Sequence, residues 1–539
     1  MTALFAVLAL FAAAALISRG YTCLHTLQLE GYRVERYLRH SAERLSWRSA
    51  VPLGVVAGTL TAGALASSAS GPWLGAVAVA VAGAVEASLY AWRVWRRPAK
   101  KPFVPTARMG RLIAATALVT VALAGLAGWG VTSAGRGLGD AGTVLAAYAV
   151  TGALFLAMPL IAVAAWGILE PFEAAMRRGF VARARRRLDA VAPLVIGIAG
   201  SYGKTTTKAA LAAALSSRYR VLATPESYNT LLGVTRTINE QLADDTEVLI
   251  VEMGARHPGD IEEICRLVRP KVGLLTRLGP QHLEYFKSEA AVVAAKTELL
   301  RALPADGIAV VDADGLEDFA APHAWQARTL RVSARMDSGA EALVEDVSVS
   351  GEGTSFSVAM RDGTVLVART RLLGRHAAFN CSLAAVAALE LGVQREAVVD
   401  GLARMAPVTH RLEVVRNDSV VVIDDAFSSN PEGFSAALEV LASFPGRHIL
   451  ITPGMIELGA EAVPAHVLIA AEAAKACDVI ILVGRTWPPE FADALRNAGF
   501  PVDALVLAES LAGASETLAG LIRPGDVVLF ENDLPDNFA

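Results

Sequence analysis

The chain has 539 residues, of which 54% are hydrophobic and 19% are charged, and its formal net charge is −4. Its mean hydropathy of +0.44 is too high for a wholly soluble protein, and the small negative charge gives no sign of a nucleic-acid partner. Four scattered cysteines without ligand spacing indicate a reducing compartment and no disulfide framework.

Residues 1–173 hold most of the apolar excess and are predicted to form a transmembrane module of about five helices. Each apolar stretch has about 17 to 26 residues, enough to cross a hydrocarbon core of about 30 Å. The first stretch could also be a signal peptide, but it lacks a basic start and a clear cleavage site. The stretches cover residues 2–18, 51–70, 73–92, 112–131 and 144–169.

Arginine and lysine gather in three segments: 19–48 between the first and second stretches, 93–111 between the third and fourth, and 177–187 after the fifth. Because positive loops stay inside, we expect a multi-pass protein of the inner (cytoplasmic) membrane, with the lipid bilayer as a partner and the later domains in the cytoplasm. Residues 174–189 read as a basic membrane-proximal linker, and residues 19–49 as an interfacial amphipathic helix. Glu86 is a candidate functional carboxylate inside the third stretch.

Residues 195–208, VIGIAGSYGKTTTK, have the layout of a phosphate-binding loop between a strand and a helix. Glycines allow the backbone to approach phosphates, the helix N-terminus offers N–H groups, and Lys204 adds a positive charge. Ile198 stands where the strict pattern requires its first glycine, so the spacing is G-x2-G-x2-GKT. The alternative is an ordinary glycine-rich turn.

Two apolar strands are predicted at 247–252 and 271–276, and a helix at 288–303 with Ser288 as its N-cap. Strands that alternate with helices predict a mostly parallel sheet, whose ligands bind at the carboxyl ends of the strands. Glu252 and His282 fall at such ends, where they could hold Mg2+ with a threonine hydroxyl of the loop. From spacing alone, His282 could equally be a capping or core histidine, and Lys296 a solvated helix lysine.

Nine motifs resemble, in order, those of the Mur ligase family, the ATP-dependent amide-bond ligases of cell-wall precursor synthesis. The most similar subgroup adds D-alanyl-D-alanine to UDP-N-acetylmuramoyl tripeptide. The motifs are GIAGSYGKTTT (197–207), EMGARHPGDI (252–261), LGPQHLEYF (278–286), AAKTELL (294–300), LLGRHAAFN (372–380), HRLEVV (410–415), DDAFSSNP (424–431), GMIELG (454–459) and RPGDVVL (523–529).

This resemblance implies the fold class α/β behind the α-helical membrane module. A central P-loop-type ATP-binding domain with a mostly parallel sheet would cover 190–405, and a C-terminal Rossmann-like domain would cover 406–539. Within the second domain the sequence predicts strands at 420–423, 448–452 and 479–483, with helices at 432–443 and 464–476.

The resemblance also implies roles for individual residues. Catalytic residues would be Lys204, Lys296, His282 and Glu252. ATP would be bound by Gly200, Ser201, Gly203, Lys204, Thr205, Thr206, Asn380 (adenine), Arg411 (phosphate) and Asp425 (ribose). Two Mg2+ ions are expected, the first on Thr205 and Glu252, the second on His282 and a carbamylated Lys296, whose carbamate supplies an oxygen ligand.

The implied reaction is attack of a carboxylate on the γ-phosphate of ATP, followed by attack of an amine on the acyl phosphate. Three departures from the subgroup alter the expected substrates. Apolar stretches replace the UDP-binding domain, Phe427 and Ser428 replace a tyrosine and an asparagine, and Glu531 and Asp533 stand in place of a lysine-glycine-serine stretch.

The leading hypothesis is therefore a membrane-anchored ligase that joins a carboxylate acceptor, lipid-linked or a cell-envelope polymer precursor, to an amino-acid or dipeptide amine. The first alternative is the UDP-N-acetylmuramoyl-tripeptide ligase itself, with D-alanyl-D-alanine as its amine. The second is a non-catalytic ATP-binding membrane scaffold.

Overall fold

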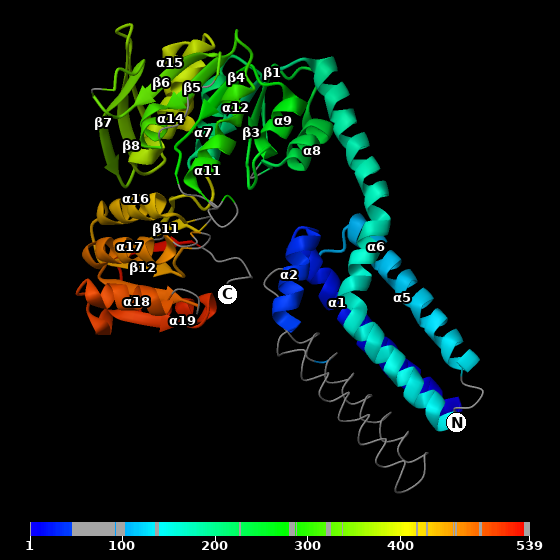
Figure 1. Ribbon diagram of the computed structural model, residues 1–539. Helices are drawn as coiled ribbons and strands as arrows, with labels where there is room; N and C mark the ends of the chain where they lie inside the picture. Colours follow the sequence, from blue (N-terminus) through cyan, green and yellow to red (C-terminus); the bar gives the residue numbers. More distant parts are fainter. Residues whose placement is uncertain are drawn as a thin grey trace. The chain divides into compact units, whose positions relative to one another are not determined.

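A computed structural model describes residues 2–45, 92, 103–134, 139–225, 228–279, 286, 288–319, 325–336, 338–416, 419–426, 429–455, 458, 461–484 and 488–532. The chain divides into two compact units, Met1–Gly179 and Phe180–Ala539 (Figure 1). The four-segment division expected from the sequence stays a prediction.

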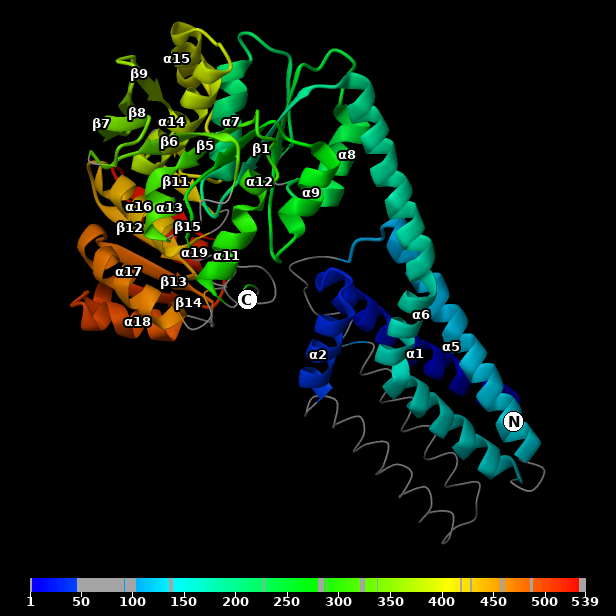
Figure 2. The same ribbon diagram turned by 45° about the horizontal axis from the view of Figure 1, so that its top comes forward.

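The first unit is helical. It contains α1 (Thr2–Leu29), α2 (Val34–Leu45), α5 (Ala107–Ala134) and the first part of α6 (Gly139–Val191), and α1, α5 and α6 run side by side (Figure 2). Leu27, Met109 and Met158 are buried where these helices meet. Arg111 of α5 places Nε 2.7 Å from Oε1 of Glu173 on α6.

Two of the described helices are long and apolar enough, by length and composition alone, to cross a membrane: Ala107–Ser133 and Ala149–Val191. The helices α5 and α6 contain the fourth and fifth predicted stretches, and α1 contains the first. The second and third stretches, with Glu86, lie outside the described residues apart from Trp92.

The prediction of one amphipathic helix over 19–49 is wrong within the described range. The chain leaves α1 at Leu29 and starts α2 at Val34, because Gly31 (φ 63°) and Tyr32 (φ 62°) adopt left-handed conformations that end the first helix. The basic segment 174–189 is helical throughout, as part of α6.

The second unit begins with a nine-stranded sheet in the order β2-β3-β1-β4-β5-β6-β7-β8-β9. Strands β1 to β7 pair in parallel, and β8 and β9 add antiparallel. The strands are β1 (Leu194–Ala199), β2 (Val221–Ala223), β3 (Val248–Glu252), β4 (Val272–Leu275), β5 (Ile308–Asp312), β6 (Arg328–Ser333), β7 (Ala342–Ser350), β8 (Gly353–Met360) and β9 (Val365–Thr370).

Helices cover both faces of this sheet, which explains why its central strands are apolar without alternation. One face carries α7 (Lys204–Leu215), α14 (Arg375–Glu390) and α15 (Arg395–Arg404). The other carries the end of α6 and α8 (Leu231–Gln241), α9 (Asp260–Val268), α11 (Glu289–Lys296) and α12 (Glu298–Arg301), while α13 (Ala313–Asp318) follows β5.

The predicted helix over 288–303 is interrupted at Thr297, between α11 and α12. The Thr297 hydroxyl donates to the carbonyls of Val293 and Ala294, and such back-bonding bends a helix. The predicted N-cap is confirmed, because Ser288 Oγ accepts a hydrogen bond from Ala291 N at 3.2 Å.

A six-stranded sheet completes the unit, in the order β10-β11-β15-β12-β13-β14, and only β10 is antiparallel. Both sheets are therefore mostly parallel, as predicted. The strands are β10 (Glu413–Arg416), β11 (Val421–Asp425), β12 (His448–Thr452), β13 (Val479–Val483), β14 (Leu505–Ala508) and β15 (Val527–Glu531); the helices are α16 (Pro431–Ala442), α17 (Ala462–Ala476), α18 (Pro488–Asn497), the 3-10 turn η3 (Val502–Ala504) and α19 (Leu511–Leu521).

Candidate active site

The phosphate loop connects β1 to α7 and depends on two glycines. Gly200 (φ 144°) and Gly203 (φ 80°) adopt conformations that side chains disfavour. A Cβ at Gly200 would lie 2.0 Å from Thr276 Oγ1, and one at Gly203 would lie 2.2 Å from Asn380 Oδ1. The loop therefore packs against β4 and α14 so closely that only glycine fits at either position.

Lys204, the first residue of α7, folds back over the loop. Its Nζ donates to the carbonyls of Gly200 (2.7 Å) and Ser201 (2.8 Å). Burial lowers the pKa of Lys204 to about 8, although the negative charge of Glu252 opposes this. Ser201 and Thr206 are buried, while Thr205, one residue after Lys204, is half-buried and accessible to a ligand.

Glu252 ends β3 in a buried position, and two partners hold its carboxylate. Lys208 Nζ lies 2.9 Å from Oε2, and Asn229 Nδ2 donates to Oε1 at 3.1 Å. Burial alone would raise the pKa of Glu252, but Lys208 and Lys204 outweigh it and the pKa lies below its ordinary value. Lys208 was not among the predicted site residues, although its position four residues after Lys204 places both on one helix face.

Lys296 is only 1% exposed, so the alternative of a solvated helix lysine is wrong. Its Nζ donates to the carbonyl of Ala255 over 3.4 Å, a long contact that compensates little of the cost of burying a charge. Burial, and then the positive charge of Lys204, lower its pKa well below the ordinary value. His282 lies outside the described residues, and its role stays a prediction.

Three more predicted residues reach the loop or its neighbourhood. Asn380 of α14 is buried against Gly203. Arg411, just before β10, donates from Nη2 to Thr205 Oγ1 at 3.5 Å. Asp425, at the end of β11, accepts from Leu412 N at 3.2 Å, and burial raises its pKa to about 6. The second sheet thus contributes groups to a site that the first sheet begins.

Glu531 is in register with Asp425 on the neighbouring strand β15 and is fully buried. Ser429 Oγ donates to its Oε1 at 2.6 Å. Burial, and then the charge of Asp425, raise the pKa of Glu531 well above its ordinary value. The sequence showed the charge reversal at this position but not its partner, and Asp533, Phe427 and Ser428 lie outside the described residues.

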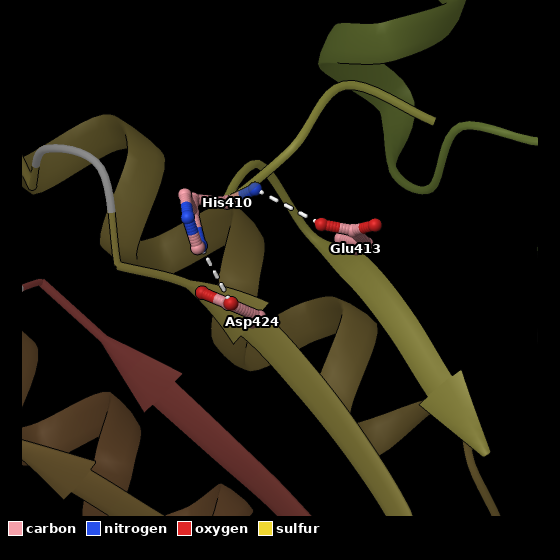
Figure 3. Close-up of side chains that lie close together, drawn as sticks. All are labelled: His410, Glu413 and Asp424. Carbon is pink, nitrogen blue, oxygen red and sulfur yellow. Dashed lines mark hydrogen bonds and ion pairs between the residues drawn. The ribbon is translucent and has the colours of Figure 1, made fainter. Parts of the chain in front are cut away.

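A cluster of His410, Glu413 and Asp424 lies where β10 begins (Figure 3), and His410 directly precedes Arg411 in the chain. His410 places Nδ1 2.7 Å from Asp424 Oδ2, and its backbone N–H donates to Glu413 Oε2 at 3.2 Å. Glu413 and Asp424 are cross-strand partners, so two like charges lie opposite each other on neighbouring strands. Asp424 accordingly raises the pKa of His410, which the sequence analysis did not single out.

Comparison with known proteins places this geometry in a family. Residues 198–389 match the Mur ligase middle domain, and residues 410–531 match the Mur ligase, glutamate ligase domain. Over 366 residues the chain is 33% identical to the UDP-N-acetylmuramoyl-tripeptide--D-alanyl-D-alanine ligase of Mycobacterium leprae, covering 62% of this chain and 70% of that protein. The chain belongs to the Mur ligase family.

Other Mur ligases give similar matches in sequence and in structure. The Escherichia coli ligase of the same name is 33% identical over 294 residues, which cover 54% of this chain and 64% of that protein. MurF from Acinetobacter baumannii (26% identity, TM-score 0.57) covers 65% of this chain and 75% of its own. MurF from Thermotoga maritima, in complex with ADP (25% identity, TM-score 0.57), covers 66% and 80%.

These matches leave part of each protein unpaired. The chain spans between 54% and 71% of the length of the curated relatives named for this ligase activity. Both family matches lie after residue 197, within the unit that holds the two sheets.

Proposed function

We propose that this Mur ligase joins UDP-N-acetylmuramoyl tripeptide to D-alanyl-D-alanine in an ATP-dependent step of peptidoglycan precursor synthesis. The observation that carries the proposal is the glycine-dependent phosphate loop with Glu252 and buried Lys296 beside it, in a chain 33% identical to ligases of that name. The first alternative from the sequence thus takes precedence over the leading hypothesis.

The residues fit a nucleotide and Mg2+. Loop amides and the Lys204 ammonium would bind the phosphates, with Asn380 on the adenine, Arg411 on a phosphate and Asp425 on the ribose. Thr205 and Glu252 would hold a first Mg2+, whose charge, once bound, offsets that of the phosphates. A hydroxyl and a carboxylate are oxygen donors, as Mg2+ prefers, and Glu252 is kept ionised by Lys208.

Lys296 suits the proposed carbamate. A lowered pKa favours the neutral amine of Lys296, which can add carbon dioxide and release a proton, and the carbamate anion formed would lie near the positive charge of Lys204. As the family resemblance implies, this carbamate and His282 would together hold a second Mg2+. The rest of the site would hold the carboxylate acceptor in line with the γ-phosphate and then bind the amine.

The test is amide formation by the purified full-length chain. With UDP-N-acetylmuramoyl tripeptide, D-alanyl-D-alanine, ATP and Mg2+, mass spectrometry should detect the joined product. Lys204→Met should abolish it, whereas Lys271→Met, at an exposed lysine paired only with Asp306 among the described contacts, should not. Release of ADP without amide would refute the proposal, whereas binding of ATP without release of ADP would favour the non-catalytic ATP-binding scaffold.

A second candidate keeps the membrane anchor and a different acceptor. It is favoured by the two long apolar helices in a region that precedes the family matches, and by the acidic Glu531 in the segment where the resemblance implies a lysine-glycine-serine stretch. Under it, residues 1–173 sit in the cytoplasmic membrane, the catalytic domains face the cytoplasm, and the carboxylate is lipid-linked. Membrane fractionation, and assays that offer lipid-linked and UDP-linked acceptors in competition, distinguish the two candidates.

A further inference from the structure

Arg277, which follows β4, is hydrogen-bonded to the phosphate loop through its backbone. Its carbonyl accepts from Ser201 N at 2.9 Å and from Tyr202 N at 3.1 Å. On either side, Thr276 Oγ1 donates to Tyr202 O at 2.5 Å and Ser201 Oγ donates to Gly279 O at 2.9 Å. Residues 276–279 therefore run along the loop, and neither can shift without moving the other.

The Arg277 side chain contacts carboxylates on both sheets' domains. Nη2 donates to Asp318 of α13 at 2.9 Å, and Nη1 lies 3.8 Å from buried Asp312 at the end of β5. Nε donates to Glu432 at 3.1 Å, and Glu432 lies in the first turn of α16, the first helix of the second sheet's domain. One side chain thus joins the phosphate loop's support to the domain that supplies Arg411 and Asp425.

Tyr202 of the loop adds a second connection. A Cβ on Gly279 would lie 2.3 Å from Tyr202 Cε2, so the ring packs directly on the 276–279 segment. Burial raises the pKa of Tyr202, and the charge of Glu432 raises it further, which places the phenol in the field of the same carboxylate that binds Arg277. The loop, residues 276–279 and the start of α16 form one continuous network.

We infer that Arg277 is a positioning residue that couples the conformation of the phosphate loop to the docking of the α16 domain. A ligand that moves the amides of Ser201 and Tyr202 also moves the carbonyl of Arg277, and with it the guanidinium that holds Glu432. Docking of the α16 domain brings Arg411 to Thr205. The site is therefore complete only when the phosphate loop has the conformation that keeps Arg277 on Glu432.

An ion pair with only a structural role would behave differently. An isolated, partly exposed ion pair contributes little, and its loss would change neither nucleotide response nor rate by much. The coupling instead predicts that Arg277→Met lowers kcat about five- to tenfold while the KM for ATP changes by less than about threefold, since the lost interaction acts after nucleotide binds. This kinetic part rests on the proposed ligase activity.

Matched variants test whether Arg277 acts through Glu432. Glu432→Gln should reproduce the fall in kcat, and the double variant should be no slower than Arg277→Met alone. Arg277→Lys, which keeps the charge, should recover part of the rate. Arg335→Met is the control, because the described ion pairs of Arg335, with Glu317 and Asp318, stay within the first sheet's domain.

A measurement independent of catalysis completes the test. Spin labels on Val367→Cys in β9 and Asn497→Cys in α18 of the full chain report the distance between the two domains. A non-hydrolysable ATP analogue should narrow the distance distribution in the parent, and much less in Arg277→Met or Glu432→Gln. An unchanged response in these variants, additive kinetic losses, or a parent without any response would overturn the inference. A response without amide formation would refute the proposed function alone.

Discussion

Glu531, fully buried at the end of β15, lies in register with Asp425 at the end of β11, so two carboxyl groups meet on neighbouring strands. Burial raises the pKa of both carboxyl groups, and the charge of Asp425 raises that of Glu531 further. This relationship leads to a pH dependence that an ion pair at the same place would not show.

For acids with raised pKa values, the contribution to stability is full below the unfolded pKa of about 4 and is lost as the pH rises through the folded values. We expect the thermal stability of the parent to fall as the pH rises through about 6, and that of Glu531→Gln to fall less. Melting curves across the pH range check this, with Glu516→Gln on exposed α19 as the control. Parallel curves for the parent and Glu531→Gln would contradict it.

Gly203→Ala should abolish nucleotide binding, because the new Cβ would collide with Asn380 and the backbone would be strained at φ 80°. Gly259→Ala is a matched control, since Gly259 has a similar φ of 90° but no atom within 4 Å of its Cβ position. Binding of a fluorescent ATP analogue measures both. Equal losses in the two variants would show that backbone strain, and not the contact with Asn380, causes the effect.

Lys208→Met should leave Glu252 buried without its cation, at a cost of about 3 kcal/mol. Because Mg2+ with ATP can then replace the lost charge, its addition should raise the melting temperature more in this variant than in the parent. The double variant Lys208→Met/Glu252→Gln should lose this extra response. A smaller response to Mg2+ in Lys208→Met would mean that Lys208 organises the site and does not merely neutralise it.

Lys296→Ala should lower ligase activity at least about a hundredfold if a carbamate forms there, and small carboxylates or bicarbonate should restore part of it. Bicarbonate-free buffer should likewise slow the parent reversibly. Rates with and without added bicarbonate measure both effects. Full activity of the parent after exhaustive removal of carbon dioxide would rule out the carbamate.

Sequence reasoning located the strands of the site because continuous apolar runs such as Val248–Glu252 are typical of strands covered on both faces. Glu252 was placed at a strand end because the apolar run stops there. It could not foresee the burial of Lys296, since lysine is seldom buried and only tertiary packing decides the exception. The break at Thr297 depends on one hydroxyl turned toward its own helix.

Contacts between distant residues were also beyond the sequence. Arg277 and Glu432 are 155 positions apart, and nothing local marks either as the other's partner. The pairing of Asp425 with Glu531 requires the strand order, which places β15 between β11 and β12. Such contacts follow from the register of a sheet assembled from separated segments.

The end of α6 has a practical consequence for making a soluble catalytic fragment. Ala184 and Leu188 are buried in the core beneath the first sheet, Arg185 donates to Arg266 O at 2.6 Å, and Arg187 donates to Leu242 O and Asp244. A fragment that starts at residue 190, at the expected start of the central domain, would lose these contacts and expose the apolar surface they cover. One that starts at Phe180 keeps them and should express as the better-behaved protein.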